Sequence, residues 1–394
     1  MRDDPVVILG YARTPMGGFQ GALSGMKATE LGAVAIKAAV ERSAMEPSII
    51  GRAYMGCVLP AALGQAPARQ ATLGAGLPRS VEATTVNKMC GSGMQAVIMA
   101  SEALAAGAVE AVVAGGMESM SNAPYALPKH RAGARIGHDR VIDTMMMGGL
   151  EDAYVAGKPM GAFAEDAVRE YQFSRGEQDD YALRSLGRAA DAIASGAFTR
   201  EIEPVEVPGR TGVSIVAVDE QPGKAKPDKI PSLKPAFVKD GTITAANASS
   251  ISDGAAALLL TRASIARQHG LPMTARIVAT AAHAHDPAQF TTAPVPAIGK
   301  VLEKAGWSID DVDLFEINEA FAVVAMIAAR DLAIPADKLN VNGGATALGH
   351  PIGASGARIL VTLLAALQNR GLKRGIASLC IGGGEATAIA VELL

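Results

Sequence analysis

The sequence predicts an α/β protein made of two similar halves, with a loop-rich segment inserted into the first half. Short runs of β-branched residues alternate with Ala-rich stretches of helical character, which is typical of helices layered on buried strands. The last third of the chain repeats the order of elements found in the first third, which indicates an internal duplication. Of the 394 residues, 49% are hydrophobic and only 4% aromatic, so small side chains must build the core.

The first half alternates between strands and helices. The expected strands are 5–10, 52–60 and 108–116, and the expected helices are 30–43 and 91–107. The segment 82–90 leads directly into the second of these helices.

The amino-acid composition of the chain changes after Gly116. From Ser121 to Asn247 the sequence contains more Pro and charged residues than the part before it. Ser174, with Glu177 three residues later, forms a capping-box pattern that predicts a helix over 174–196. Long irregular segments in compact proteins usually have a function, so we expect an ordered covering domain over 121–247. The first half is then 1–120 plus 248–270, and the second half is 271–394.

The second half repeats the first in order. A strand is expected at 275–282, followed by a helix and a strand within 296–322. The pair Val341-Asn342 then parallels Val86-Asn87. In both places we expect a strand end, a Gly- and Ser-rich turn, an apolar helix and a strand that ends in glycines.

Charge and cysteine content exclude several classes of protein. The chain has 36 Lys and Arg against 39 Asp and Glu, a formal net charge of −3, which argues against nucleic-acid binding. Three cysteines do not make a disulfide framework. The N-terminal sequence does not resemble a signal peptide, and no apolar run approaches the ~20 residues that span a bilayer. We therefore expect a cytoplasmic protein that does not enter a membrane.

Four side chains at strand ends and helix starts are candidates for chemistry. Cys90 precedes a predicted helix, where backbone N–H groups and the helix dipole favour the thiolate. His350 occupies the matching turn of the second half, so the repeat places it near Cys90 as a candidate base. Asn318 and Cys380 follow predicted strands, where open α/β sheets build their sites.

The cysteines and the glycines around them also fit three other interpretations. The sequence from Gly91 to Ala96 fits G-x-G-x-x-A, a dinucleotide fingerprint, but it lies far from the first strand. Two cysteines and a histidine could bind zinc, but no C-x-x-C or H-x-x-x-H pair accompanies them. Cys57, inside a predicted strand, is expected to be ordinary packing.

Five blocks of the sequence together resemble one known family. They are VNKMCGSGMQA, GGMESMSNAPYAL, NEAFA, VNGGATALGHPIGASGARIL and LCIGGGEA. In this order and spacing they resemble the signature blocks of thiolases, most closely the acetyl-CoA acetyltransferase group. The resemblance runs from Val6 to the C-terminus. It implies a duplicated, five-layered αβαβα fold with a loop domain inserted in the first half.

The resemblance also implies a role for each catalytic candidate. Cys90 would carry the acyl group as a thioester, His350 would take its proton, and Cys380 would remove the α-proton of a second acetyl-CoA. One oxyanion hole would be formed by His350 with a water held by Asn318, the other by the N–H groups of Cys90 and Gly382. The expected reaction interconverts two acetyl-CoA with acetoacetyl-CoA plus CoA.

Further residues are implied to contact CoA, which is a substrate; no metal or other cofactor is expected. Ser249, Met160, Phe321 and Ala320 match positions along the pantetheine arm and the acyl channel. Lys226 and Lys229 either face the CoA phosphates or belong to a solvated loop. The resemblance implies a homo-oligomer, and the expected state is a tetramer.

Some residues depart from the family pattern and leave the acyl chain length open. Pro159 stands where many short-chain members have His, Phe290 where some have Met, and Glu385 where Met is common. A degradative 3-ketoacyl-CoA thiolase acting on longer chains is therefore the alternative. A nucleotide-dependent dehydrogenase and a non-catalytic CoA-binding relative are alternatives from other classes. The presence of all four candidate residues argues against the non-catalytic relative.

Overall fold

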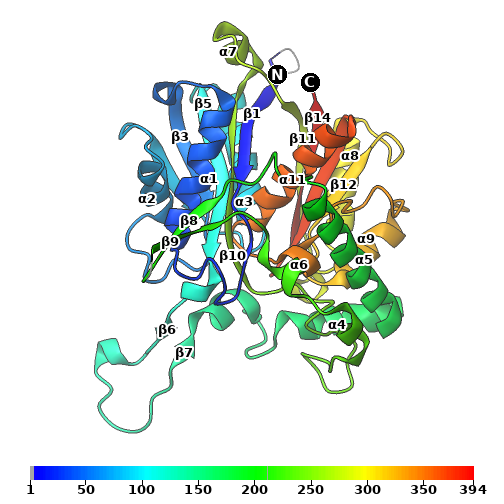
Figure 1. Cartoon of the computed structure of the whole chain (residues 1–394). Helices are drawn as coiled ribbons and strands as arrows, with labels where there is room; N and C mark the ends of the chain where they lie inside the picture. Colours follow the sequence, from blue (N-terminus) through cyan, green and yellow to red (C-terminus); the bar gives the residue numbers. More distant parts are fainter. Residues whose placement is uncertain (1–3, 211) are drawn as a thin grey trace.

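The computed structural model describes residues 4–210 and 212–394. Most described strands belong to one extended sheet system, with helices on both sides and between its two parts (Figure 1). The strands are β1 Val6–Arg13, β2 Gly17–Gly18, β3 Ile50–Gly56, β4 Glu82–Val86, β5 Ala111–Ser119, β6 Tyr125–Ala126, β7 Ile142–Asp143, β8 Val205–Gly209, β9 Gly212–Val216, β10 Ser252–Arg262, β11 Ala275–Ala284, β12 Leu314–Ile317, β13 Arg374–Ile381 and β14 Glu385–Leu393. The helices are α1 Ala28–Ser43, α2 Pro67–Gly74, α3 Ser92–Ala105, α4 Met160–Tyr171, α5 Arg175–Ala194, α6 Glu220–Lys224, α7 Ala263–Gln268, α8 Pro294–Ala305, α9 Ala322–Asp331, α10 Ala345–Leu348 and α11 Ser355–Arg370.

The sheet system repeats one topology twice. The first part has the order β4-β3-β5-β10-β1 and the second has β12-β13-β14-β11. In each part the first strands pair in parallel and the last ones antiparallel. The two parts meet where β1 pairs with β11, at Val7 with Arg276 and Ile8 with Ala275. This matched order agrees with the duplication expected from the sequence.

One predicted strand end is absent from the second half. Where β4 forms a strand in the first half, the second half has only an isolated bridge between Phe315 and Leu339. The side chain of Asn340 replaces the missing ladder, because it accepts from the Ile317 N–H and donates to the Ile317 carbonyl, each at 2.8 Å. The expectation of a strand before Val341-Asn342 was therefore wrong.

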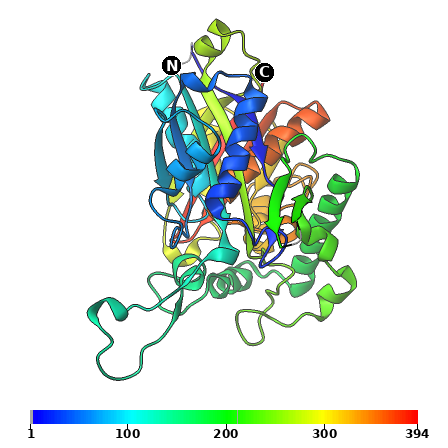
Figure 2. The same ribbon diagram turned by 60° about the vertical axis from the view of Figure 1, so that its left-hand side comes forward.

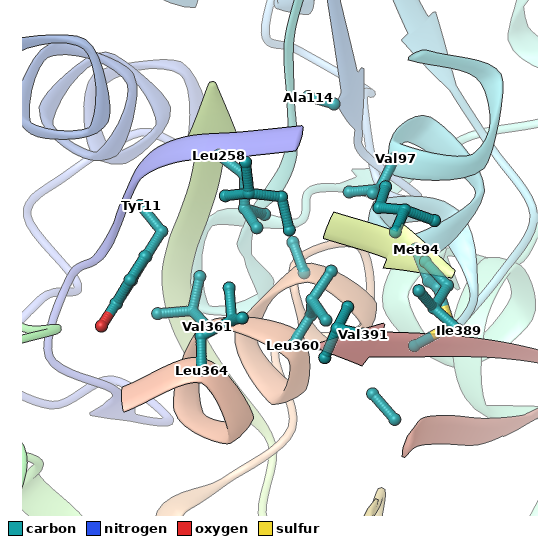
Figure 3. Close-up of a cluster of buried hydrophobic side chains, with 14 of the residues drawn as sticks. Tyr11, Met94, Val97, Ala114, Leu258, Leu360, Val361, Leu364, Ile389 and Val391 are labelled. Carbon is teal, nitrogen blue, oxygen red and sulfur yellow. The ribbon is translucent and has the colours of Figure 1, made fainter. Parts of the chain in front are cut away.

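The helices and strands form five layers, and three apolar clusters lie between these layers. One cluster packs α1 and α2 on the outer face of the first part of the sheet system, which we call the first sheet. Another packs α8 and α9 on the outer face of the second part, the second sheet. The third lies between the sheets and contains α3 and α11 (Figure 3). It joins Met94 and Val97 of α3 to Leu360 of α11, with Leu258 from one sheet and Ile389 from the other. This αβαβα arrangement is the predicted fold.

The two central helices approach closely at their starts. Gly93 and Gly356 are the second residues of α3 and α11. A Cβ on Gly93 would lie 2.8 Å from the Ala357 backbone nitrogen, and a Cβ on Gly356 would lie 2.4 Å from that of Met94. Both contacts are with backbone, so neither position has room for a side chain.

Residues 121–210 and 212–247 form an ordered region that covers one end of the layers and extends along their side (Figures 1 and 2). It contains the projecting β6–β7 hairpin, a π-helix over Met146–Leu150, the helices α4 to α6 and the β8–β9 hairpin. As expected, Ser174 caps α5, since its side chain accepts from the Glu177 N–H. The division of the chain at 120, 247 and 270 stays a prediction.

A buried ion cluster ties this region to the first strand. Arg13 is fully buried and its Nε lies 2.5 Å from Glu201, while its two terminal nitrogens lie 2.7 and 2.8 Å from the Asp219 carboxylate. Removing Arg13 would leave two buried carboxylates without a compensating charge, and breaking a buried ion pair in this way typically costs about 3–5 kcal/mol. The region is therefore anchored to the scaffold that carries the candidate site.

Candidate active site

The turn before α3 presents Cys90 in a constrained backbone. Met89 has a φ of +47°, in the left-handed region that is unfavourable for a non-glycine residue. The Asn87 side chain accepts from the Met89 N–H at 3.1 Å, and Ser92 Oγ donates to the Met89 carbonyl at 2.6 Å. Strained residues held by such contacts are common at functional sites. The sequence Asn-Lys-Met-Cys-Gly-Ser therefore fixes the position of the Cys90 sulfur.

The turn before α11 presents His350. Its backbone N–H donates to the Ser250 carbonyl at 3.1 Å. Its Nδ1 lies 2.5 Å from Ser355 Oγ, and that hydroxyl donates to the Pro351 carbonyl at 2.9 Å. The buried Nε2 has no hydrogen-bond partner among the described protein groups. His350 is thus oriented by one ring nitrogen and keeps the other for a reactant.

Cys380 and Gly382 lie at the end of the β13–β14 hairpin. Cys380 is the penultimate residue of β13 and is 1% exposed. The turn that follows is Gly382-Gly383-Gly384, in which Gly383 and Gly384 have φ values of +99° and +84°. Glycine tolerates these angles, so the turn can direct its N–H groups without side-chain obstruction.

Asn318 follows β12 and lies behind the surface of the site. It is fully buried, and its N–H donates to the Ser378 carbonyl at 3.0 Å. Neither atom of its side-chain amide has a partner among the described residues. The next residue, Glu319, accepts from Tyr181, Ser185, Asn340 and Thr346, which fixes this loop to α5 and to the turn before α10.

These loops converge on one apolar cavity of about 410 Å³. Eight of the nine residues predicted for the site line its wall; Asn318, buried behind it, does not. The eight are Cys90, Met160, Ser249, Ala320, Phe321, His350, Cys380 and Gly382. The insertion supplies a further part of the wall through Met146, Leu150 and Phe237.

Ser249 has a structural contact of its own. Its Oγ donates to the Ala320 carbonyl at 2.9 Å, and its N–H donates to the same oxygen at 3.0 Å. Ala248 bridges to Phe321 alongside. The serine therefore holds the segment that follows the insertion against the loop that contains Asn318, while it also faces the cavity.

Burial determines the resting protonation of the site. It raises the pKa of the Cys90 thiol to about 11, although the Gly382 N–H lowers it. Burial, assisted by the Arg358 charge, lowers the pKa of His350 to about 3. Burial and the neighbouring Cys90 raise the pKa of Cys380 well above its ordinary value.

The helix start at Cys90 does not by itself lower the pKa of the thiol. Loss of solvation in the cavity outweighs the N–H groups at the start of the helix. At neutral pH the resting site holds a thiol beside an uncharged imidazole. Cys90 then requires a base to become a nucleophile, and the free Nε2 of His350 can supply it.

The structure confirms that Cys57 is a packing residue but places it outside the predicted strand. This residue follows the end of β3 at Gly56 instead of lying within a strand. It is buried, as expected, but its Sγ lies 3.6 Å from a carboxylate oxygen of Glu118, an interaction that raises the pKa of the thiol beyond the effect of burial.

Glu118 and Ser355 were missed as site-shaping residues. The Glu118 carboxylate accepts from the N–H groups of Val58, Leu59 and Gly353, at 2.9 to 3.2 Å. Burial raises its pKa to about 7. Gly353 belongs to the turn that follows His350, so Glu118 fixes that turn from behind. Both residues lie inside the resemblance blocks, but nothing in their spacing distinguishes them from packing residues.

A second hollow opens beside the catalytic cavity and shares Ala245 and Ser250 with it. Its volume is about 330 Å³, and its wall includes Lys224, Lys226 and Lys229. The two lysines singled out from the sequence therefore lie together at a hollow that adjoins the catalytic groups.

The structure gives the glycine fingerprint another explanation. Gly93, its second glycine, faces the backbone of α11, so its missing side chain serves helix packing.

Within residues 4–210 and 212–394, no group of three or more His, Cys, Asp or Glu side chains is arranged to hold a metal ion. In the same ranges, none of the helices combines the length and apolar character needed to cross a bilayer.

Comparisons with known proteins agree with this architecture. The family model of the thiolase N-terminal domain matches residues 6–264, and that of the thiolase C-terminal domain matches 271–393. Acetyl-CoA acetyltransferase 2 of Arabidopsis thaliana is 51% identical over 99% of this chain and 97% of its own. Acetyl-CoA acetyltransferase of Schizosaccharomyces pombe is 46% identical over all of both chains.

Two solved structures share the whole fold. The acetyl-CoA acetyltransferase of Bacillus anthracis superposes with a TM-score of 0.96, at 42% identity over 99% of each chain. The Acat5 thiolase of Ascaris suum, in complex with coenzyme A, has a TM-score of 0.93, at 41% identity over 99% of this chain and 100% of that one. These matches confirm the resemblance seen in the sequence motifs: the chain belongs to the thiolase family.

Proposed function

We propose that this protein is an acetyl-CoA acetyltransferase that condenses two acetyl-CoA to acetoacetyl-CoA and CoA, and catalyses the reverse thiolysis. One observation carries the proposal: two thiols and a histidine with a free Nε2 face a single apolar cavity. The relatives that bear this activity in their names span the entire chain, which supports it.

In the first half-reaction, His350 Nε2 takes the Cys90 proton and the thiolate attacks the acetyl-CoA carbonyl. The oxyanion that forms is stabilised by the N–H groups of Cys90 and Gly382. The carbon–sulfur bond to CoA then breaks. The departing thiolate takes the proton of Cys380, which leaves an acetylated Cys90, an imidazolium and a Cys380 thiolate.

In the second half-reaction, the Cys380 thiolate removes the α-proton of another acetyl-CoA. The enolate oxygen accepts from the imidazolium of His350 and from a water bound to the free amide of Asn318. The enolate carbon attacks the thioester on Cys90. The released Cys90 sulfur takes the proton of His350, so all three groups return to their neutral starting forms.

CoA is proposed to extend from the catalytic cavity into the adjoining hollow. Its apolar pantetheine arm matches the wall formed by Met160 and Phe321, and its phosphates match Lys226 and Lys229. CoA acts as a substrate in this scheme, and no other cofactor is required. The cytoplasmic location and the tetramer stay predictions from the sequence.

Thiolysis of a series of 3-ketoacyl-CoA esters tests the proposal. Loss of the ketoacyl-CoA is followed at fixed CoA for the four-carbon ester and its six- and eight-carbon homologues. We expect the highest kcat/KM on acetoacetyl-CoA. Higher values on the longer esters would assign the protein to the degradative class with the same mechanism, and no thiolysis would overturn the proposed function.

A further inference from the structure

An ion pair crosses the junction between the two halves next to the nucleophile. The ammonium of Lys88 is paired with the carboxylate of Glu385, with the two side chains 24% and 35% exposed. Lys88 lies two residues before Cys90, and Glu385 lies three residues after Gly382. The pair therefore connects the two loops whose N–H groups form the proposed oxyanion hole.

The loop on the second half contains few side chains that could fix it. Ile381 pairs with Glu385 at the base of the hairpin, and three glycines form the turn between them. On one side the turn is held by the His285 N–H, which donates to the Gly384 carbonyl at 2.9 Å. Glu385 provides a tether on the side that faces Cys90.

Hydrogen bonds within the loop of the first half fix the backbone of Lys88 relative to that of Cys90. The Lys88 N–H donates to Ser92 Oγ at 2.8 Å, and the Lys88 carbonyl accepts from the Gly91 N–H at 3.0 Å. Gly91 in turn abuts Ile381, because a Cβ on Gly91 would lie 2.3 Å from Ile381 Cδ1. Lys88 thus belongs to the same rigid turn as the Cys90 N–H.

We propose that the Lys88–Glu385 pair is a clamp that sets the separation of the Cys90 and Gly382 N–H groups. Both residues are positioning residues, since neither is among the residues that line the cavity. The inference rests on the proposed function, because the two N–H groups matter only if an acyl carbonyl is attacked between them. It also gives a role to Glu385, which departs from the family pattern.

The expected effect is on rate more than on stability. Partly exposed ion pairs contribute little to folding, whereas loss of one oxyanion donor costs about 10²- to 10³-fold in kcat. A donor that is displaced but still present should cost less than one that is lost. We therefore expect a decrease of about 3- to 10-fold, below the cost of a missing donor.

The test measures acetylation of Cys90 by acetyl-CoA, with rapid quenching and intact-protein mass spectrometry. Lys88→Met and Glu385→Gln should each slow acetylation by about 3- to 10-fold at saturating acetyl-CoA, with little change in its half-saturating concentration. The double variant should be no slower than the slower single one, because the two changes remove one interaction. Lys88→Arg, and the exchange of the two charges in K88E/E385K, should restore most of the rate.

Glu392→Gln is the matched control. It removes the ion pairs of Glu392 with Arg276 and Arg374 at the far end of the same strand, β14, so it should leave acetylation unchanged. Independent, additive losses in the two single variants, or full activity in both, would overturn the clamp. A failure of the unaltered protein to become acetylated would instead overturn the proposed function.

Discussion

Nδ1 of His350 lies 2.5 Å from Oγ of Ser355, and this hydroxyl lies 2.9 Å from the Pro351 carbonyl. A carbonyl only accepts, so the single hydroxyl hydrogen points to Pro351 and Oγ accepts from Nδ1–H. The uncharged imidazole then carries its proton on Nδ1. Ser355 therefore selects the tautomer in which Nε2 can remove the proton of Cys90.

Ser355→Ala should lower the rate of Cys90 acetylation by about 10- to 100-fold, a part of what general base catalysis contributes. The half-saturating acetyl-CoA concentration should change little, because Ser355 does not line the cavity. Ser43→Ala is the control, since it removes another buried hydroxyl that donates to a backbone carbonyl, within α1. Equal rate losses in both variants would reduce Ser355 to a packing residue.

Cys380→Ser should separate the two half-reactions. The hydroxyl is a weaker acid than a thiol and its alkoxide is not available as a base, so the two steps should respond differently. Acetylation of Cys90, in which Cys380 only gives a proton to the departing thiolate, should become slower but persist, whereas exchange of the α-proton of acetyl-CoA with deuterium should be lost. Mass spectrometry of the protein follows the first step, and that of acetyl-CoA follows the second. Cys90→Ser is the complementary control, in which stable acetylation should be lost. Loss of both steps in Cys380→Ser would contradict the assigned roles.

The alkylation of Cys90 should depend steeply on pH. Its pKa is raised to about 11 while that of His350 is lowered to about 3, so the resting pair is neutral between those values. The rate with iodoacetamide should rise about tenfold per pH unit from neutral pH upward, because only the thiolate reacts. Peptide mapping identifies the labelled cysteine. A rate that is already constant near neutral pH would show a thiolate–imidazolium pair.

The same shift at His350 affects stability in acid. Because its pKa is lowered in the folded state, the uncharged imidazole contributes stability above the unfolded value of about 6.5. This contribution is lost as the pH falls from there toward about 3. His350→Asn should therefore flatten the decline of the unfolding midpoint over this interval. An unchanged decline would place the acid-sensitive group elsewhere.

Phe290→Leu should widen the range of acyl chains. Phe290 is 2% exposed, lines the cavity and packs edge-on against Phe321 at a centroid distance of 6.3 Å. A smaller side chain leaves room that a longer acyl group can fill, worth about 0.8 kcal/mol per buried methylene. The measurement is the ratio of kcat/KM for 3-ketohexanoyl-CoA and acetoacetyl-CoA. Phe315→Leu, in the core of the second half, should lower stability without changing this ratio.

The fold was predictable because its signals are local and repeated. Alternating strand and helix patterns appear twice, and the capping box of α5 needs only Ser174 and Glu177. The missing strand before Asn342 was not predictable in this way. Its place is taken by the amide of Asn340, which bonds to Ile317, a partner distant in sequence.

The candidate residues were predictable as a set, but their electrostatic state was not. A helix start favours a thiolate, and that local rule was applied to Cys90. The opposing effect is burial, which depends on how Met146 and Phe237 of the insertion cover the cavity. Ser355 was missed for a similar reason, because its importance depends on which ring nitrogen of His350 it contacts.

The close approach of Gly93 to the start of α11, and of Gly356 to the start of α3, has a consequence for how this molecule can evolve. Each glycine lies against the backbone of the other copy of the repeat, so a methyl group at either position would push the two copies apart. A matching change in the other copy could not compensate, since each glycine faces backbone atoms, the nitrogens of Ala357 and Met94, which no substitution removes. The repeats can diverge at less crowded positions, whereas the close approach of the two helix starts leaves both copies of the repeat dependent on a glycine.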